Sequence, residues 1–403
     1  MPFGPAHPTV RAVGGPGRVG AIPAAGEGTA AYRAAWTATL LFFGGFYALL
    51  VPLPRYLTAQ GFQDGQIGLI LGAFGVASLI GRPLAGLATD RYGARAVMRF
   101  GAIALTLGAL AVPLTVSLPG LFGLRILQAV GYVAFTTAGT ALVVALVDPA
   151  ERGRRVALFG AAANVAITAT PALVTLLLDV APLGAGFLLG GLLALVSGSL
   201  TLRLPRASVT TAPFTLALPR RLWVPMLVSA LLGGAFVGFF QFAPILADRR
   251  GTVSPGHLYL IYGLAIIGTR VVGGHLIDWY GAGPVVALAC ALMVAGHGLI
   301  ATTDALAPLL LAPALIAAGG GMFHPALIAH HAALLPGAPG RATAAFYLAF
   351  DLGIGGGSWV CGLALEAAGL PGLFSIAAAM AALALPMSLG LRRPTAELPP
   401  VDR

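Results

Sequence analysis

The sequence predicts an all-α membrane protein in which twelve transmembrane helices form two pseudo-symmetric six-helix bundles. Of its 403 residues, 58% are hydrophobic and only 9% are charged, and the mean hydropathy is +0.92. A soluble domain is about one quarter charged, and a soluble core could not bury so much apolar surface. One motif also occurs twice, with its aspartates at positions 90 and 278. This repetition indicates two halves built on one plan.

Twelve apolar stretches are long enough to cross a bilayer. In the first half they lie at about 33–57, 66–88, 96–116, 119–147, 156–178 and 184–204. In the second half they lie at about 222–247, 256–277, 284–303, 307–333, 342–366 and 371–391. Proline and glycine within these stretches are compatible with membrane helices, because neighbouring helices satisfy the backbone groups that such residues free.

Three segments outside the apolar stretches are polar or rich in Pro and Gly. Residues 1–30 have the composition of a disordered tail, 205–221 that of a linker, and 394–403 form a short polar tail. We therefore predict an N-terminal bundle at 31–204 and a C-terminal bundle at 222–393, with the tails and the linker in the cytoplasm.

The orientation follows from the arginines. All 23 basic residues are Arg; seventeen lie in the tails, linker and loops assigned to the cytoplasm, whereas only Arg55, Arg249 and Arg250 lie in outer loops. This bias is the positive-inside pattern of a membrane protein. The net charge of +10 is therefore a topology signal and does not indicate nucleic-acid binding.

The duplicated motif has the form Arg-x3-Gly-x3-Asp-x-Tyr-Gly and ends one apolar stretch in each half. The first copy contains Arg82, Gly86, Asp90, Tyr92 and Gly93, and the second contains Arg270, Gly274, Asp278, Tyr280 and Gly281. Residues four apart share a helix face, so each copy places a charge, a small residue and a terminal acid on one stripe. The glycine after the tyrosine is expected to end the helix.

Extended by Arg91 and Arg95, the first copy resembles the loop signature between the second and third helices of the major facilitator superfamily, Gly-x3-Asp-Arg-x-Gly-x-Arg. The second copy departs from it at Trp279, which replaces the basic residue. The resemblance covers residues 31 to 393 and implies alternating access to a central cavity. We expect Asp90 and Asp278 to be gating contacts at the cytoplasmic end. We also expect Gly86 and Gly274 to let a helix of the opposite half approach closely.

The segment that starts at Arg125 resembles a second signature of that superfamily, the fourth-helix motif Arg-x-x-Gln-Gly-x-Gly. Gln128 and Gly131 match it, whereas Ala129 replaces the first glycine. In proton-coupled relatives this arginine is associated with proton transfer or anionic substrate. The alternative is an arginine that extends to the interface, since Pro119 is only six residues away.

The fifth stretch matches the antiporter element of the superfamily, Gly-Pro-x-x-Gly-Gly, poorly, because only Gly160 and Pro171 hint at it. Asn164 is its one amide; a packing hydrogen bond and a role in the cavity are both open for it. By contrast, Pro52-Leu-Pro54 resembles the end of the first helix in drug and sugar efflux relatives.

His324 follows three glycines and precedes Pro325 in the tenth stretch, near the middle of the membrane. Histidine titrates near neutral pH and could carry a proton. A structural histidine with a satisfied ring is the alternative.

Arg82 and Asp351 are predicted to pair across the two halves. In the superfamily the second helix faces the eleventh, and here Arg82 lies roughly 12 Å inside Asp90 and Asp351 roughly 15 Å inside Arg341, from the same side. An unpaired charge at such depth is costly, which favours a pair. Asp351 is then the leading candidate for proton coupling, and a permanent structural ion pair is the alternative.

The internal repeat places Asn164 on Asp351, so Arg270 in the second copy is expected to meet only this neutral amide. The two halves would then differ in one titratable group.

Taken together, these features predict a secondary active transporter of a small organic solute in the plasma membrane, most simply a proton-coupled efflux antiporter for a drug-like molecule or metabolite. Proton-linked uptake of a sugar or organic anion is the alternative within this class. A non-transporting membrane sensor or a membrane-embedded enzyme is the alternative from another class. We predict no cofactor, metal or nucleic-acid partner, because no nucleotide or metal motif is present, and we expect a monomer.

Overall fold

The computed structural model describes residues 25–147, 152–206, 219–335 and 338–391, which form helices and turns without a strand. Most of the predicted N-terminal tail, most of the linker and the C-terminal tail lie outside the described residues. The first bundle consists of α1 (Ala25–Tyr47), α2 (Pro52–Ala59), α3 (Asp64–Tyr92), α4 (Ala94–Leu110), α5 (Leu118–Leu146), α6 (Arg152–Leu178) and α7 (Gly184–Leu200).

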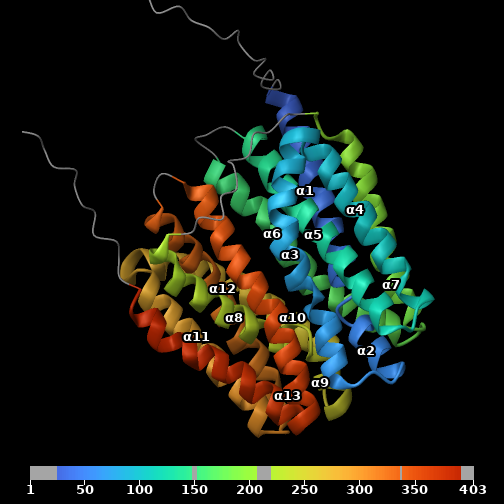
Figure 1. Cartoon of the computed structure of the whole chain (residues 1–403), viewed down its shortest axis with the longest axis vertical. Coiled ribbons are helices and arrows are strands. Elements are labelled where there is room, and N and C mark those ends of the chain that lie inside the picture. The colour runs from blue at the N-terminus through green and yellow to red at the C-terminus, as the bar shows by residue number, and fades with distance from the viewer. Residues whose placement is uncertain (1–24, 148–151, 207–218, 336–337, 392–403) are drawn as a thin grey trace, which may run out of the picture.

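The second bundle lies beside the first (Figure 1). It consists of α8 (Trp223–Phe240), α9 (Ala243–Arg250), α10 (Pro255–Tyr280), α11 (Ala282–Thr302), α12 (Leu306–Leu334) and α13 (Pro339–Leu389). Helices α3 and α13 pack together across the two bundles, as do α6 and α10. These are the cross-bundle pairs that the family resemblance implies.

By length and hydropathy, nine of the described helical segments could cross a membrane, or ten if the bent α10 counts as one span. Helix α4 is not among them because it has only 17 residues, and α13 counts once although it has 51. Ala368 and Gly369, the latter with φ 65°, are non-helical and divide α13 into two spans. With α4 added and α13 divided, the helices account for the twelve predicted spans.

Three boundaries differ from the sequence prediction. Helix α1 begins at Ala25, inside the predicted tail, although Gly26 and Gly28 there are poor helix formers. The first span is broken between α1 and α2, and the seventh between α8 and α9, where a single helix was expected in each case. Pro52 and Pro244 lie in the first turns of α2 and α9; proline lacks an N–H donor, so it starts a helix more readily than it continues one.

Gly93 and Gly281 end α3 and α10 as predicted. They adopt φ of 81° and 82°, which only glycine adopts without strain, and their N–H groups donate to Thr89 O and Ile277 O. These turns define one end of the molecule, here called the Asp90 end. The opposite end, where α2 and α9 lie side by side at the bottom of Figure 1, is called the Asp248 end.

Candidate functional site

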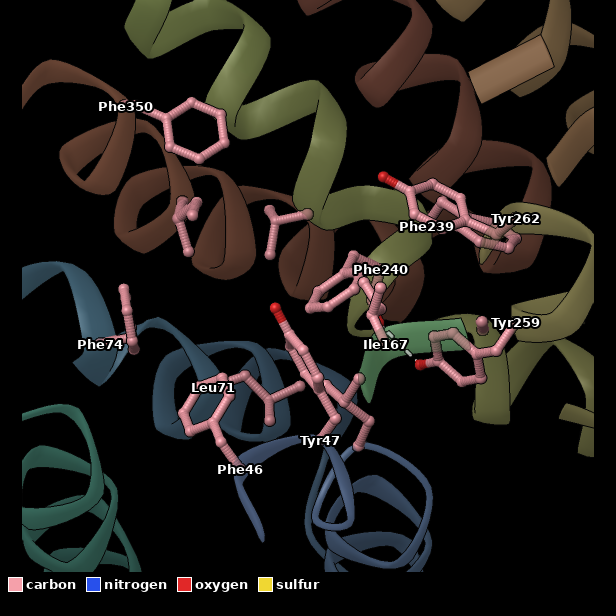
Figure 2. Packing of buried hydrophobic residues seen from close by; sticks show 14 of the residues in the cluster. Phe46, Tyr47, Leu71, Phe74, Ile167, Phe239, Phe240, Tyr259, Tyr262 and Phe350 are labelled. Atoms are coloured by element: carbon pink, nitrogen blue, oxygen red, sulfur yellow. Dashed lines mark hydrogen bonds between the residues drawn. The ribbon is translucent and has the colours of Figure 1, made fainter. Parts of the chain in front are cut away.

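A cavity of about 870 Å³ lies between the two bundles. Its volume is within the usual range of small-molecule sites, roughly 300–1,000 Å³. Aromatic rings line the cavity from both sides: Phe43, Phe46, Tyr47, Phe74, Tyr132, Phe135 and Phe159 come from the first bundle, and Phe236, Phe240, Tyr262, Tyr347 and Phe350 from the second. Figure 2 shows Phe46, Tyr47 and Phe74 on one side with Phe240 and Phe350 across from them.

The cavity extends to the Asp90 end of the molecule. Asp90, Gly340 and Arg341 line it there, and the first two are exposed. Towards the Asp248 end the two bundles meet instead, with the ring centres of Tyr47 and Phe240 5.9 Å apart. The structure is therefore open at the Asp90 end and closed at the other.

Two ion pairs from α9 close the Asp248 end. Arg55 of α2 binds Asp248 in a bidentate manner at 2.5–3.2 Å, and Arg249 binds Asp64 of α3 at 2.5 Å. Two consecutive residues of α9, one acidic and one basic, thus each pair with a residue of opposite charge on the first bundle. We call these four residues the α9 latch. The sequence alone did not indicate this latch, because charged residues in outer loops are ordinarily solvated.

Arg250 holds α9 on its own bundle. Its guanidinium donates to Thr303 O at 2.6 Å and Ile300 O at 2.9 Å, and it also pairs with Asp304. Because α9 is fixed in this way, the charges of the latch are presented from a rigid support.

Close backbone contact between α3 and α13 completes the closed end. A Cβ atom placed on Gly75 would lie 2.6 Å from the Cα of Gly355, and one on Gly68 would lie 2.8 Å from the Cα of Gly362. Glycine at these positions is required by the approach of the two backbones. The N–H of Gly65 also donates to Glu366 at 2.9 Å.

The predicted ion pair between Arg82 and Asp351 is present. Arg82 Nε and Nη2 both lie 2.7 Å from Asp351 Oδ2, with the two side chains 17% and 4% exposed. The guanidinium also lies 4.8 Å from the centre of the Tyr347 ring. A buried charge pair thus links α3 to α13 on the wall of the cavity, and its role stays a prediction.

The predicted contact between Arg270 and Asn164 is not among the hydrogen bonds of the described residues. Both side chains line the cavity, so the two lie on the same open space without bonding across it. Arg270 lies within electrostatic range of His324 and Tyr347.

Arg125 is 4% exposed, so it does not extend to the membrane interface. Its Nη1 donates to Gln128 Oε1 at 3.0 Å, and its guanidinium lies 5.4 Å from the centre of the Phe46 ring. Gln128 in turn donates to Gly108 O at 2.7 Å. Arg125 and Gln128 of the fourth-helix signature therefore place a guanidinium in the cavity wall, where the Gln128 amide holds it in position.

His324 also lines the cavity, packed against the aromatic rings of α12 and α13. Its Nδ1 lies 3.4 Å from Gly320 O, and its ring centre lies 4.5 Å from that of Phe350. The ring thus has a backbone partner, as the structural alternative requires, and a role as proton carrier stays a prediction.

Among the remaining motif residues, Arg95 Nη1 donates to Leu204 O at 3.2 Å, and Arg91 lies over Tyr92 at 5.4 Å. Gly86 and Asp90 line the cavity, and Asp278 is exposed at the same end.

The close helix contact expected at Gly274 is wrong for this conformation, because a Cβ at that position would meet nothing within 4 Å. The reason is that the Asp90 end is open, so no helix of the first bundle reaches Gly274. In the described part of the chain, no group of three His, Cys, Asp or Glu residues could hold a metal ion.

Comparison with known proteins identifies relatives along most of the chain. The sequence profile of the Major Facilitator Superfamily matches residues 35–357. The chain is 28% identical over 376 residues to the uncharacterized MFS-type transporter YhhS of Escherichia coli strain K12, covering 87% of this chain and 90% of that protein. YhhS of Shigella flexneri matches to the same extent.

Solved structures show the same fold. The nucleoside transporter NupG superposes with a TM-score of 0.72 at 15% identity, covering 89% of this chain and 98% of the other. A D-xylose–proton symporter gives 0.73 at 18% identity, over 89% and 96%. The human organic anion transporter MFSD10 gives 0.67 at 19% identity, over 90% and 99%.

Proposed function

This chain belongs to the Major Facilitator Superfamily, and on that premise we propose that it is a secondary active transporter in which proton binding at Asp351 drives alternating access. As a member it is a multi-pass membrane transporter of small solutes. The orientation proposed here places the Asp90 end and both termini in the cytoplasm and the Asp248 end outside, in the plasma membrane, with a monomer as the working unit.

The observation that supports proton coupling is the buried pair of Arg82 and Asp351. It joins the two bundles on the wall of a cavity that reaches the Asp90 end. Protonation of Asp351 would remove the charge that holds Arg82 and so weaken a contact between α3 and α13. The proton would thus act on the interface that has to change when the bundles rock.

The exposed acids at the Asp90 end suit a gate. When that end closes, Asp90 and Asp278 would approach basic groups and helix N-termini of the opposite bundle, which favour a nearby negative charge. We assign them to this closure and not to the substrate.

Substitution of Asp351 by Asn tests the coupling, because it keeps the shape and removes the titration. Proteoliposomes with an imposed pH gradient would be assayed with a panel of radiolabelled organic solutes, and Asp179→Asn, which removes an exposed carboxylate outside the cavity, is the matched control. We expect Asp351→Asn to lose gradient-driven accumulation and to retain solute exchange. Proton-driven accumulation that persists in this variant would contradict the assignment.

The direction of transport has two candidates. The resemblance of Pro52-Leu-Pro54 to efflux relatives supports export in exchange for protons. Uptake of an organic anion together with protons is the second candidate. The excess of arginine in the cavity suits its anionic solute, since Arg82, Arg125, Arg270 and Arg341 line the cavity, against the acids Asp90 and Asp351.

The two directions differ in whether proton binding raises or lowers the affinity for the solute. Exchange requires that proton binding lower the affinity for the solute, whereas cotransport requires that it raise that affinity. Measuring the proton flux that accompanies downhill solute movement decides between them: protons that move with the solute indicate uptake, and protons that move against it indicate efflux.

A further inference from the structure

Arg125 is a buried cation in the cavity that no carboxylate of the described residues neutralises. Its Nε has no hydrogen-bond partner, and the groups identified around the guanidinium are the amide of Gln128 and the ring of Phe46, which carry no charge. A guanidinium offers five N–H donors in a planar fork that matches an oxyanion. Burying such a charge without a counter-ion is costly, so the site is incomplete when empty.

The cavity does not supply this counter-ion from its own walls. Of the two acids that line the cavity, Asp351 is paired with Arg82, and Asp90 lies at the open mouth of the cavity. Arg125 lies seven residues from the start of α5, roughly 11 Å from the Asp248 end. Arg270 lies fifteen residues from the start of α10, roughly 22 Å from that end. An anion that enters at the Asp90 end therefore passes Arg270 before it reaches Arg125 at greater depth.

The surroundings of Arg125 suit an apolar body. The ring of Phe46, on which the guanidinium lies, is 4.7 Å from that of Tyr132, which is 5.2 Å from that of Phe74. Phe240 and Phe350 of the second bundle line the opposite wall. These rings can cover an aromatic or aliphatic skeleton.

We propose that Arg125 binds the anionic group of the transported solute, and that this solute is an organic monoanion: a carboxylate or sulfonate on an aromatic or aliphatic skeleton. Gln128 is the positioning residue, because its bond to Gly108 O fixes the amide that orients the guanidinium. This inference rests on the proposed transport function and adds the substrate class to it.

The test is equilibrium binding of matched ligands to the purified full-length protein. Each pair shares one skeleton and differs in charge: benzoate and benzamide, 2-naphthoate and 2-naphthamide, octanoate and octanamide. We expect at least one acid to bind about tenfold or more tightly than its amide, since a hydrogen bond to a charged group is worth that factor. Arg125→Gln should abolish the difference, and Arg125→Lys should retain part of it. Arg99→Gln removes an exposed arginine outside the cavity and should leave the difference unchanged.

Equal binding of acid and amide in every pair, or no acid binding at all, would overturn the proposal. So would a preference for acids that survives in Arg125→Gln and Arg125→Lys alike. The wild-type comparison and the Lys variant keep the test decisive if Arg125→Gln does not fold. Binding needs neither gradient nor turnover, so this result is independent of the Asp351→Asn transport assay: failure here leaves proton-coupled transport of a neutral solute intact, and failure there leaves the anion site intact.

Discussion

Removing the α9 latch is expected to open the Asp248 end. The double variant Asp248→Asn with Arg249→Gln deletes both cross-bundle ion pairs and keeps the side-chain shapes. The paired side chains are partly exposed, at 23% and 43% for Arg55 and Asp248 and at 38% and 16% for Arg249 and Asp64. Exposed pairs of this kind contribute about 0.2–1 kcal/mol each. Because one of them is bidentate, we expect about 1–2 kcal/mol in total, which changes the ratio of the two conformations by a factor of about 5–30.

The assay is the labelling rate of a cysteine placed at Leu50, a buried residue that lines the cavity near the closed end. A membrane-impermeant maleimide applied from the Asp248 side should react about 5–30 times faster in the double variant, in proportion to the population that is open there. The native Cys290 and Cys361 are buried, and the protein without the added cysteine gives the background rate.

The exchange of charges between Arg55 and Asp248 is the decisive control. Arg55→Asp alone should open the end, and adding Asp248→Arg should restore slow labelling, since the pair is re-formed with its charges reversed. An unchanged rate in the double Asn/Gln variant, or a charge exchange that labels as fast as Arg55→Asp, would refute the role of the latch.

Three other expectations concern the opposite end, the packing and the site. Asp90→Asn should slow solute transport while leaving solute affinity nearly unchanged; a large loss of affinity with normal turnover, measured by binding and flux, would argue against gating. Gly75→Val should lower the melting temperature, by an overpacking cost of about 1–3 kcal/mol against Gly355, whereas Gly123→Ala, where a Cβ meets nothing within 4 Å, should not. Binding of an organic anion should depend on pH, because protonation of Asp351 removes a negative charge from the cavity, and this dependence should be absent in Asp351→Asn; affinity that rises as the pH falls indicates uptake with protons, affinity that falls indicates exchange, and affinity that does not change with pH would contradict coupling at Asp351.

Much of the fold could be read from the sequence because the bilayer restricts the chain so strongly. Spans of the required length, the repeated motif and the two terminating glycines are local features, and Gly93 and Gly281 adopt the conformations expected of them. Even the pairing of Arg82 with Asp351 could be predicted, since the family resemblance places the second helix opposite the eleventh, both charges lie at one depth, and a single buried charge is costly.

What the sequence could not supply depends on the relative tilt of the two bundles. Asp64 and Arg249 lie at helix ends where charges are normally solvated, and only the closed arrangement brings them together. The contact expected at Gly274 failed for the converse reason, because the structure is open at that end. A sequence encodes both states of a transporter, whereas contacts between the bundles belong to one state at a time.

The backbone contact between α3 and α13 has a consequence for electrical insulation. A Cβ on Gly75 would lie 2.8 Å from the carbonyl oxygen of Asp351, so the tight glycine contact begins at the proposed coupling acid and continues through Gly68 to the Asp248 end. Such contact leaves no room for a file of water molecules along which protons could hop. Asp351 is then in contact with the solution on one side only, through the cavity. A side chain that wedged these helices apart would be expected to leak protons across the membrane without moving any solute, and the glycines would thereby protect the gradient that the proposed coupling uses.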